Sequence, residues 1–125
     1  MKHHDLTEKI IGCAYRVYNK MGYGFLESVY EKCLLIELKN VGIQAKAQHS
    51  ITVFYYNEVV GEFVADVIIE DAIILELKSV RRVIKAHEVQ LVNYLVATGK
   101  DVGLIINFAA QKVEIKRKVR ELAEN

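Results

Sequence analysis

Two carboxylates and one amine stand close together near the middle of the chain. Glu76 and Lys78 lie two residues apart in the otherwise apolar segment 73–79, and nine residues separate Asp66 from Glu76. Unpaired charges in a buried strand cost roughly several kcal/mol. Neighbouring carboxylates repel unless a divalent cation lies between them, and oxygen ligands favour magnesium or manganese. The pattern predicts a metal site, although an isolated E-x-K more often marks the solvated face of a strand.

The strands around these residues must bring them to one face. Alternation of apolar residues and turn signals predict strands at 51–56, 60–69 and 73–79. Pairing Asp66 with Glu76 across an antiparallel hairpin is allowed by parity and implies a loop of three residues, 70–72. Asp66, Glu76 and Lys78 then share a face. The same parity puts four apolar residues on the opposite face: Phe63, Ala65, Val67 and Ile69.

Helical spacing predicts the remaining elements. Helices are expected at about 7–20, at about 26–39, where Glu27 lies, and at 83–98. A buried strand is expected at 102–108, and the tail could add an edge strand at 113–116 and then a short helix. The order ααβββαβ predicts an α/β or α+β fold with a central mixed sheet of about four strands flanked by helices. The last buried strand should join by a helical crossover and lie parallel to a neighbour.

Composition narrows the class of protein. The 125 residues suit a single domain spanning 1–125, and 52% hydrophobic with 26% charged residues exclude a disordered chain. The longest apolar run, 102–110, is too short to cross a bilayer, and the N-terminus lacks a secretory pattern, so we expect a cytoplasmic protein without a membrane partner. The net charge of +1 demands no nucleic acid. Cys13 and Cys33 are expected to be buried free thiols.

Three motifs together resemble a known group of nucleases. Asp66 followed by Glu76-Leu77-Lys78 is similar to the PD-(D/E)XK signature, with Ala65 where the superfamily's name has proline. The segment 90–94, Gln-Leu-Val-Asn-Tyr, resembles the QxxxY element of the RecB-like branch. The segment 24–30, Gly-Phe-Leu-Glu-Ser-Val-Tyr, matches the motif of the GxxExxY family. The resemblance implies a restriction endonuclease-like core.

The resemblance also implies a role for each site residue. Asp66 and Glu76 would hold Mg²⁺ or Mn²⁺ with help from the Leu77 carbonyl, and Glu27 would complete the acidic cluster. Lys78 would orient or deprotonate the attacking water. Gln90, Tyr94 and Tyr30 are expected behind the metal ligands or at the phosphate. Glu27 could instead be an exposed acid in the first turn of its helix, where the helix dipole favours it. Tyr94 could pack in the core. His87 is expected to be exposed, or to have its hydrogen bonds made within the protein, rather than to bind a metal.

The predicted function is a metal-dependent nuclease that hydrolyses phosphodiester bonds of nucleic acid, with DNA favoured. Arg81, Arg82 and Lys85 could supply local positive charge for phosphate binding, whereas the basic tail is better explained as solvated surface. The alternative function is that of a catalytically inactive protein with the same fold, which binds nucleic acid or a partner protein in a repair or defence assembly. A structural dimerising protein is a further alternative, and a homodimer is compatible with either.

Overall fold

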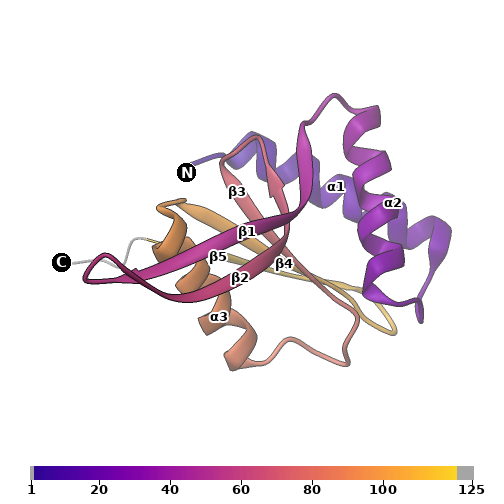
Figure 1. The fold of residues 1–125 in the computed structure, drawn as a ribbon. Helices are drawn as coiled ribbons and strands as arrows, with labels where there is room; N and C mark the ends of the chain where they lie inside the picture. Colours follow the sequence, from indigo (N-terminus) through magenta and orange to yellow (C-terminus); the bar gives the residue numbers. More distant parts are fainter. Residues whose placement is uncertain (1, 121–125) are drawn as a thin grey trace.

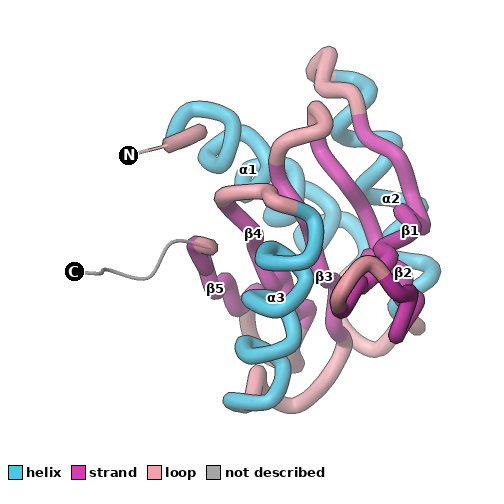
Figure 2. The backbone as a smooth tube through the Cα atoms, turned by 60° about the vertical axis from the view of Figure 1, so that its left-hand side comes forward, coloured by secondary structure: helices cyan, strands magenta, loops and turns pink. Residues whose placement is uncertain are grey.

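The computed structural model describes residues 2–120 and has helices on both faces of one sheet (Figures 1 and 2). The elements in chain order are α1 (His4–Met21), α2 (Glu27–Asn40), β1 (Ala45–Tyr55), β2 (Glu58–Ile69), β3 (Ile73–Lys78), α3 (Lys85–Thr98), β4 (Val102–Phe108) and β5 (Val113–Val119). Among these described residues, no helix is long and apolar enough to cross a membrane.

The sheet follows the chain in the spatial order β1-β2-β3-β4-β5. Its strands pair antiparallel except β3 and β4, which are parallel. A parallel pair needs a long crossover, and α3 supplies it. The predicted α+β architecture, the crossover and the parallel pair are therefore confirmed.

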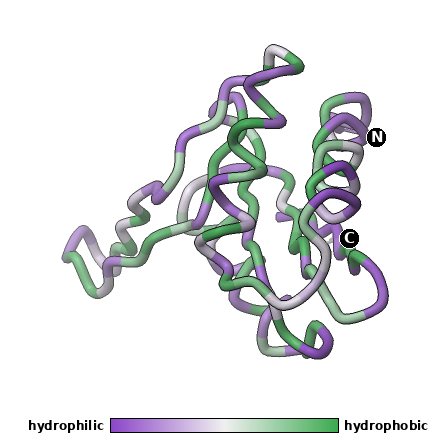
Figure 3. Tube along the Cα trace, turned by 90° about the vertical axis from the view of Figure 1, so that its right-hand side faces the viewer, coloured by the Kyte–Doolittle hydropathy of each residue, from purple (hydrophilic) through white to green (hydrophobic). Residues whose placement is uncertain are grey.

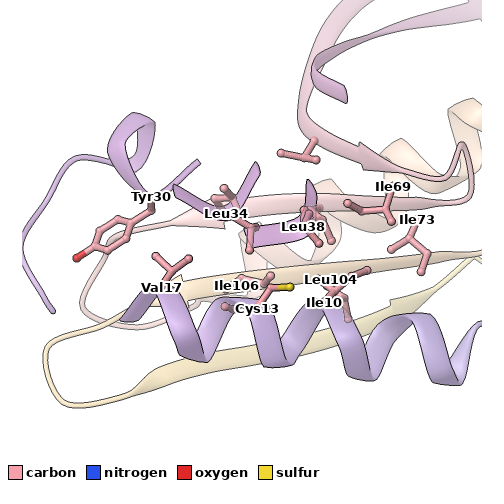
Figure 4. Close-up of a cluster of buried hydrophobic side chains, with 14 of the residues drawn as sticks. Ile10, Cys13, Val17, Tyr30, Leu34, Leu38, Ile69, Ile73, Leu104 and Ile106 are labelled. Carbon is pink, nitrogen blue, oxygen red and sulfur yellow. The ribbon is translucent and has the colours of Figure 1, made fainter. Parts of the chain in front are cut away.

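The main core lies between the sheet and the first two helices. Figure 4 shows residues of α1 (Ile10, Cys13, Val17) and α2 (Tyr30, Leu34, Leu38) facing strand residues Ile69, Ile73, Leu104 and Ile106. These helix residues recur at three- or four-residue spacing, so one stripe of each helix is buried. Figure 3 shows the same alternation of hydrophobic and hydrophilic residues along the N-terminal helix.

A smaller core lies on the other face, under α3. Leu91, Tyr94 and Leu95 of this helix pack with Ile74 and Ile105 of the sheet. Gly103 in β4 permits this close approach, because a Cβ atom there would lie 2.8 Å from a methyl group of Leu91. The far end of the β1–β2 hairpin extends away from α1 and α2, to the left in Figure 1.

Several predicted boundaries were wrong. The first strand begins at Ala45 rather than at Ile51, and the tail forms a full fifth strand through Val119, so the sheet has five strands. The short helix predicted after the edge strand falls largely on residues 121–125, outside the described residues. Cys13 is buried as predicted, but Cys33 is only half-buried, and both are free thiols.

Candidate active site

The antiparallel ladder between β2 and β3 ends beside the acidic residues. Its last pair is Val67 with Leu75. Beyond it, side chains replace backbone partners: the Asp66 N–H donates to Glu76 Oε2 at 3.1 Å, and the Leu77 N–H donates to Asp66 Oδ2 at 2.7 Å. The register and the three-residue loop are those predicted. The two carboxylates thus bridge the two strands where the backbone ladder stops.

The face assignment along β2 was wrong for part of the strand. Val67 packs against α1 and α2, but Ala65 packs in the core under α3, and the Phe63 ring lies 5.8 Å from the ring of Tyr94. The change of face occurs across Asp66, opposite Gln48, whose φ of 56° breaks the regular extension of β1. Strict alternation fails here because β2 turns away from β3.

Burial and mutual repulsion make the two carboxyls hard to ionise. Glu76 is only 6% exposed; burial first, and then the charge of Asp66, raise its pKa from 4.5 to about 7. Burial also raises the pKa of Asp66, against the Leu77 N–H bond that lowers it. Lys78 favours the charged form of both groups, but does not cancel these effects. The pair is electrostatically suited to a cation.

Glu27 lies at the start of α2 and joins that helix to the end of β3. Its Oε2 accepts a hydrogen bond from the Ser79 N–H at 3.2 Å, and the Ser79 hydroxyl donates to the Phe25 carbonyl at 3.0 Å. After burial, its charge is one of the causes that raise the pKa of Asp66 and Glu76. Glu27 is an exposed acid in the first turn of α2, as the alternative expected, and it also holds a hydrogen bond to the end of β3.

The predicted cluster of three carboxylates is not assembled in this arrangement. Among residues 2–120, no three histidine, cysteine, aspartate or glutamate side chains lie close enough together to hold one ion. The reason is local: Glu27 is engaged at Ser79, while Asp66 and Glu76 are engaged across the strand gap. The close acidic unit is a pair.

Tyr30 supports the loop that leads to Glu27. It is fully buried, its ring stacks on Phe108 with centroids 4.2 Å apart, and its hydroxyl donates to the Gly22 carbonyl. The hydroxyl also accepts a bond from the Phe25 N–H at 3.4 Å. Gly24 has a φ of 110°, which favours glycine. Gly24 and Tyr30 of the 24–30 motif thus hold the loop that leads into Glu27.

On α3, the predicted residues separate into different environments. Tyr94 is nearly buried, and burial followed by the charges of Glu76 and Asp66 raises its pKa, which places it beside the acidic pair. Gln90, one turn earlier, is exposed. His87 Nδ1 accepts a hydrogen bond from the Ile84 N–H at 3.1 Å and so caps the helix. His87 therefore makes a hydrogen bond within the protein, as was expected if it is not a metal ligand.

Sequence reasoning missed Glu31, one helical turn after Glu27. Its Oε1 accepts a hydrogen bond from the Gln48 amide at 3.0 Å. Burial raises its pKa, and Asp66 adds to this effect, so the two carboxylates are neighbours. The i, i+4 spacing from Glu27 was a usable signal, because such residues share a helix face. The position of Gln48 could not be expected, since it depends on the irregularity in β1.

A second missed feature fixes the loop between β3 and α3. Asn107 in β4 is fully buried; its Oδ1 accepts the Val80 N–H at 2.9 Å and its Nδ2 donates to the Val80 carbonyl at 3.0 Å. Glu114 accepts from both the Asn107 amide and the Val83 N–H. These bonds hold the segment that presents Arg81 and Arg82, both exposed.

Comparisons with known proteins agree with this geometry. The family model described as the PD-(D/E)XK nuclease superfamily matches residues 4–118. No curated protein matches the sequence. Among solved structures, the one titled "Crystal structure of SSO0001" is similar with a TM-score of 0.62 and 19% identity, over 77% of this chain and 50% of that chain. The chain therefore spans about half the length of that protein, and the likeness concerns the fold.

Proposed function

Because this chain belongs to the PD-(D/E)XK nuclease superfamily, we propose that it is a metal-dependent nuclease that hydrolyses phosphodiester bonds, with DNA as its substrate. The observation that carries the proposal is the pair Asp66 and Glu76, placed across the gap between β2 and β3 with Lys78 beside them. The coarse restriction endonuclease-like fold agrees with this assignment.

The donor set of the gap fits a divalent ion. A carboxylate offers about four lone-pair positions, so each single backbone bond leaves oxygen capacity on Asp66 and Glu76. N–H and C=O groups of one strand residue point the same way, which directs the Leu77 carbonyl toward the gap. Oxygen ligands of this kind favour Mg²⁺ or Mn²⁺. Such an ion polarises a phosphoryl oxygen and acidifies bound water.

Lys78 is the candidate for water activation. It follows Glu76 by two residues on β3, and its charge favours the ionised form of both carboxyls. A lysine there orients the water through hydrogen bonds and, in its neutral form, accepts a proton from it. Glu27 contributes by anchoring Ser79 and adds negative charge near the pair.

We further place the chain in the GxxExxY branch and give it a QxxxY element. The role of the 24–30 motif in fixing Glu27 supports the first assignment. The position of Tyr94 beside Glu76 supports the second, with Tyr94 behind the carboxylates and exposed Gln90 available to a phosphate.

The test is a nuclease screen of the purified protein on single- and double-stranded DNA and RNA with Mg²⁺ or Mn²⁺. We expect cleavage by the wild type and none by Glu76→Ala. Lys78→Ala should keep the fold and the metal affinity but lose cleavage by orders of magnitude, because the lost interaction matters mainly in the transition state. Lys78→Arg should not restore it fully, since arginine cannot accept the proton.

One observation favours a second candidate function. Both carboxylates already accept backbone hydrogen bonds, and residues 2–120 contain no preassembled three-ligand group. A binding module without turnover needs no more than this. Binding of nucleic acid without cleavage under any metal condition would decide for that module.

A further inference from the structure

A groove lined by aromatic side chains lies beside the candidate active site. It lies between the β1–β2 hairpin and α3 and has a volume of about 920 Å³. Phe54 and Phe63 line it from the hairpin, and Tyr94 lines it from the helix. Phe54 is 61% exposed and Phe63 is 46% exposed, so both side chains are partly open to solvent. An open aromatic surface of this kind is unusual on a protein without a ligand or partner.

Tyr94 connects the groove with the part of the sheet that carries the acidic pair. Tyr94 belongs both to its lining and to the buried cluster that contains Ala65 and Ile74. Ala65 is adjacent in sequence to Asp66, and Ile74 precedes Glu76 by two residues on the same strand. The charges of Glu76 and Asp66 act on the Tyr94 hydroxyl, in agreement with this placement. A ligand in the groove therefore lies next to the site of the proposed chemistry.

The polar groups of the groove suit an anionic, base-containing ligand. Within the described part of the chain, its lining includes one cation, Lys85, and no carboxylate. Gln90 and Asn93 add amides that can donate to and accept from base edges. Aromatic faces, amide groups and a cation are the features with which proteins bind unpaired nucleotides.

We propose that this groove binds unpaired nucleotides of a single-stranded nucleic acid and leads the strand to Asp66 and Glu76. The inference rests on the proposed function and narrows its substrate to single strands or unpaired ends. Bases in a duplex are stacked on their neighbours, so their faces are not available to Phe54 or Phe63. If a second copy of this chain occupied the groove instead, it would cover one side of the site. Sedimentation velocity distinguishes such a dimer from binding of a nucleic-acid strand.

The experiment measures binding without turnover. Fluorescence anisotropy in EDTA compares a labelled single-stranded DNA oligonucleotide with the duplex of the same sequence. We expect the wild type to bind the single strand more tightly. Phe54→Ala should weaken single-strand binding about 10-fold, the loss of one stacked base. Tyr56→Ala is the matched control, because Tyr56 is 84% exposed at the hairpin tip and does not line the groove.

The charge of the groove has its own readout. Lys85→Gln should reduce the slope of log affinity against log salt by about 0.7 for a single strand, whereas Lys39→Gln, exposed on α2, should leave it unchanged. Circular dichroism checks that each variant folds. A preference for duplex, or unchanged single-strand binding by Phe54→Ala, would overturn the inference.

The outcomes distinguish this inference from the proposed function. Tight single-strand binding that depends on Phe54, without cleavage in any metal, would reject the nuclease and keep the groove. Cleavage of DNA by Phe54→Ala at wild-type KM would keep the nuclease and reject the groove. A wild-type dimer in sedimentation velocity that Phe54→Ala dissociates would assign the groove to a second copy and overturn the proposal.

Discussion

Replacing Glu76 with glutamine should remove a pH-dependent loss of stability. Burial, and then Asp66, raise the pKa of Glu76 from 4.5 to about 7 in the folded protein. Between these values the folded state holds a proton that the unfolded state has released. The stabilisation by this proton is complete below pH 4.5 and is lost as the pH rises through about 7, so the free energy of unfolding falls across this window.

The magnitude follows from the two pKa values. Each pH unit between them corresponds to about 1.4 kcal/mol, so the difference between 4.5 and about 7 costs the wild type about 3 kcal/mol above neutral pH. Solvent screening does little to reduce this figure, because the side chain is only 6% exposed. Glutamine has no charge to bury, and its carbonyl oxygen can still accept the Asp66 N–H.

Urea unfolding in EDTA at pH 5 and pH 8 measures the effect. The difference in unfolding free energy between Glu76→Gln and the wild type should shift in favour of the variant by up to about 3 kcal/mol from the lower to the higher pH. Glu8→Gln, at an exposed position of α1, is the control and should show no such shift relative to the wild type. If the difference for Glu76→Gln is the same at both pH values, burial and the charge of Asp66 do not raise the pKa of Glu76 in the folded protein.

Three further perturbations test the metal site, the loop support and the buried clamp. Mg²⁺ or Mn²⁺ should raise the wild-type Tm by binding only the folded state, and Asp66→Asn should abolish the rise; an unchanged rise would place the ion elsewhere. Tyr30→Phe removes the hydrogen bond to the Gly22 carbonyl and should lower the free energy of unfolding by about 1 kcal/mol in urea. It should also lower the cleavage rate, because the loop that leads into Glu27 loses support. Wild-type activity at reduced stability would show that Tyr30 serves folding alone. Asn107→Leu leaves the N–H and the carbonyl of Val80 without the side-chain amide that binds them, and should lower the free energy of unfolding by about 2 kcal/mol or more in urea. Wild-type stability of this variant would show that these two hydrogen bonds do not stabilise the loop.

The site was predictable where its geometry depends on local pattern. The apolar segment 73–78 and the turn before it set the register between β2 and β3, and the pairing of Asp66 with Glu76, which parity allowed, agrees with this register. Both turn residues, Glu70 and Asp71, have positive φ values in the structure and close the short loop. Register is strongly specified here because a one-residue slip would expose the buried side of β3.

The rest depends on departures from regular structure, which periodicity cannot express. Gln48 adopts a positive φ opposite Asp66, and β2 changes face there, so Phe63 and Ala65 lie under α3 rather than against α1. Glu31 accepts its hydrogen bond from Gln48, the residue at this irregularity. In the sequence Asn107 only interrupts an apolar strand, because Val80, whose backbone it binds, lies 27 residues away.

The departures in β1 and β2 accompany the end of the ladder between β2 and β3. When β2 leaves β3, the N–H group of Leu77 loses the carbonyl that a continued ladder would supply, and the N–H group of Asp66 lies opposite the irregular position Gln48 of β1; buried donors must be satisfied. The carboxylates of Glu76 and Asp66 accept them instead. The same bonds that complete the backbone therefore hold two negative charges at a fixed separation in a poorly solvated place. An amide at position 66 or 76 can keep the strand connection while removing the charge, which is why Asp66→Asn and Glu76→Gln can separate metal binding from folding.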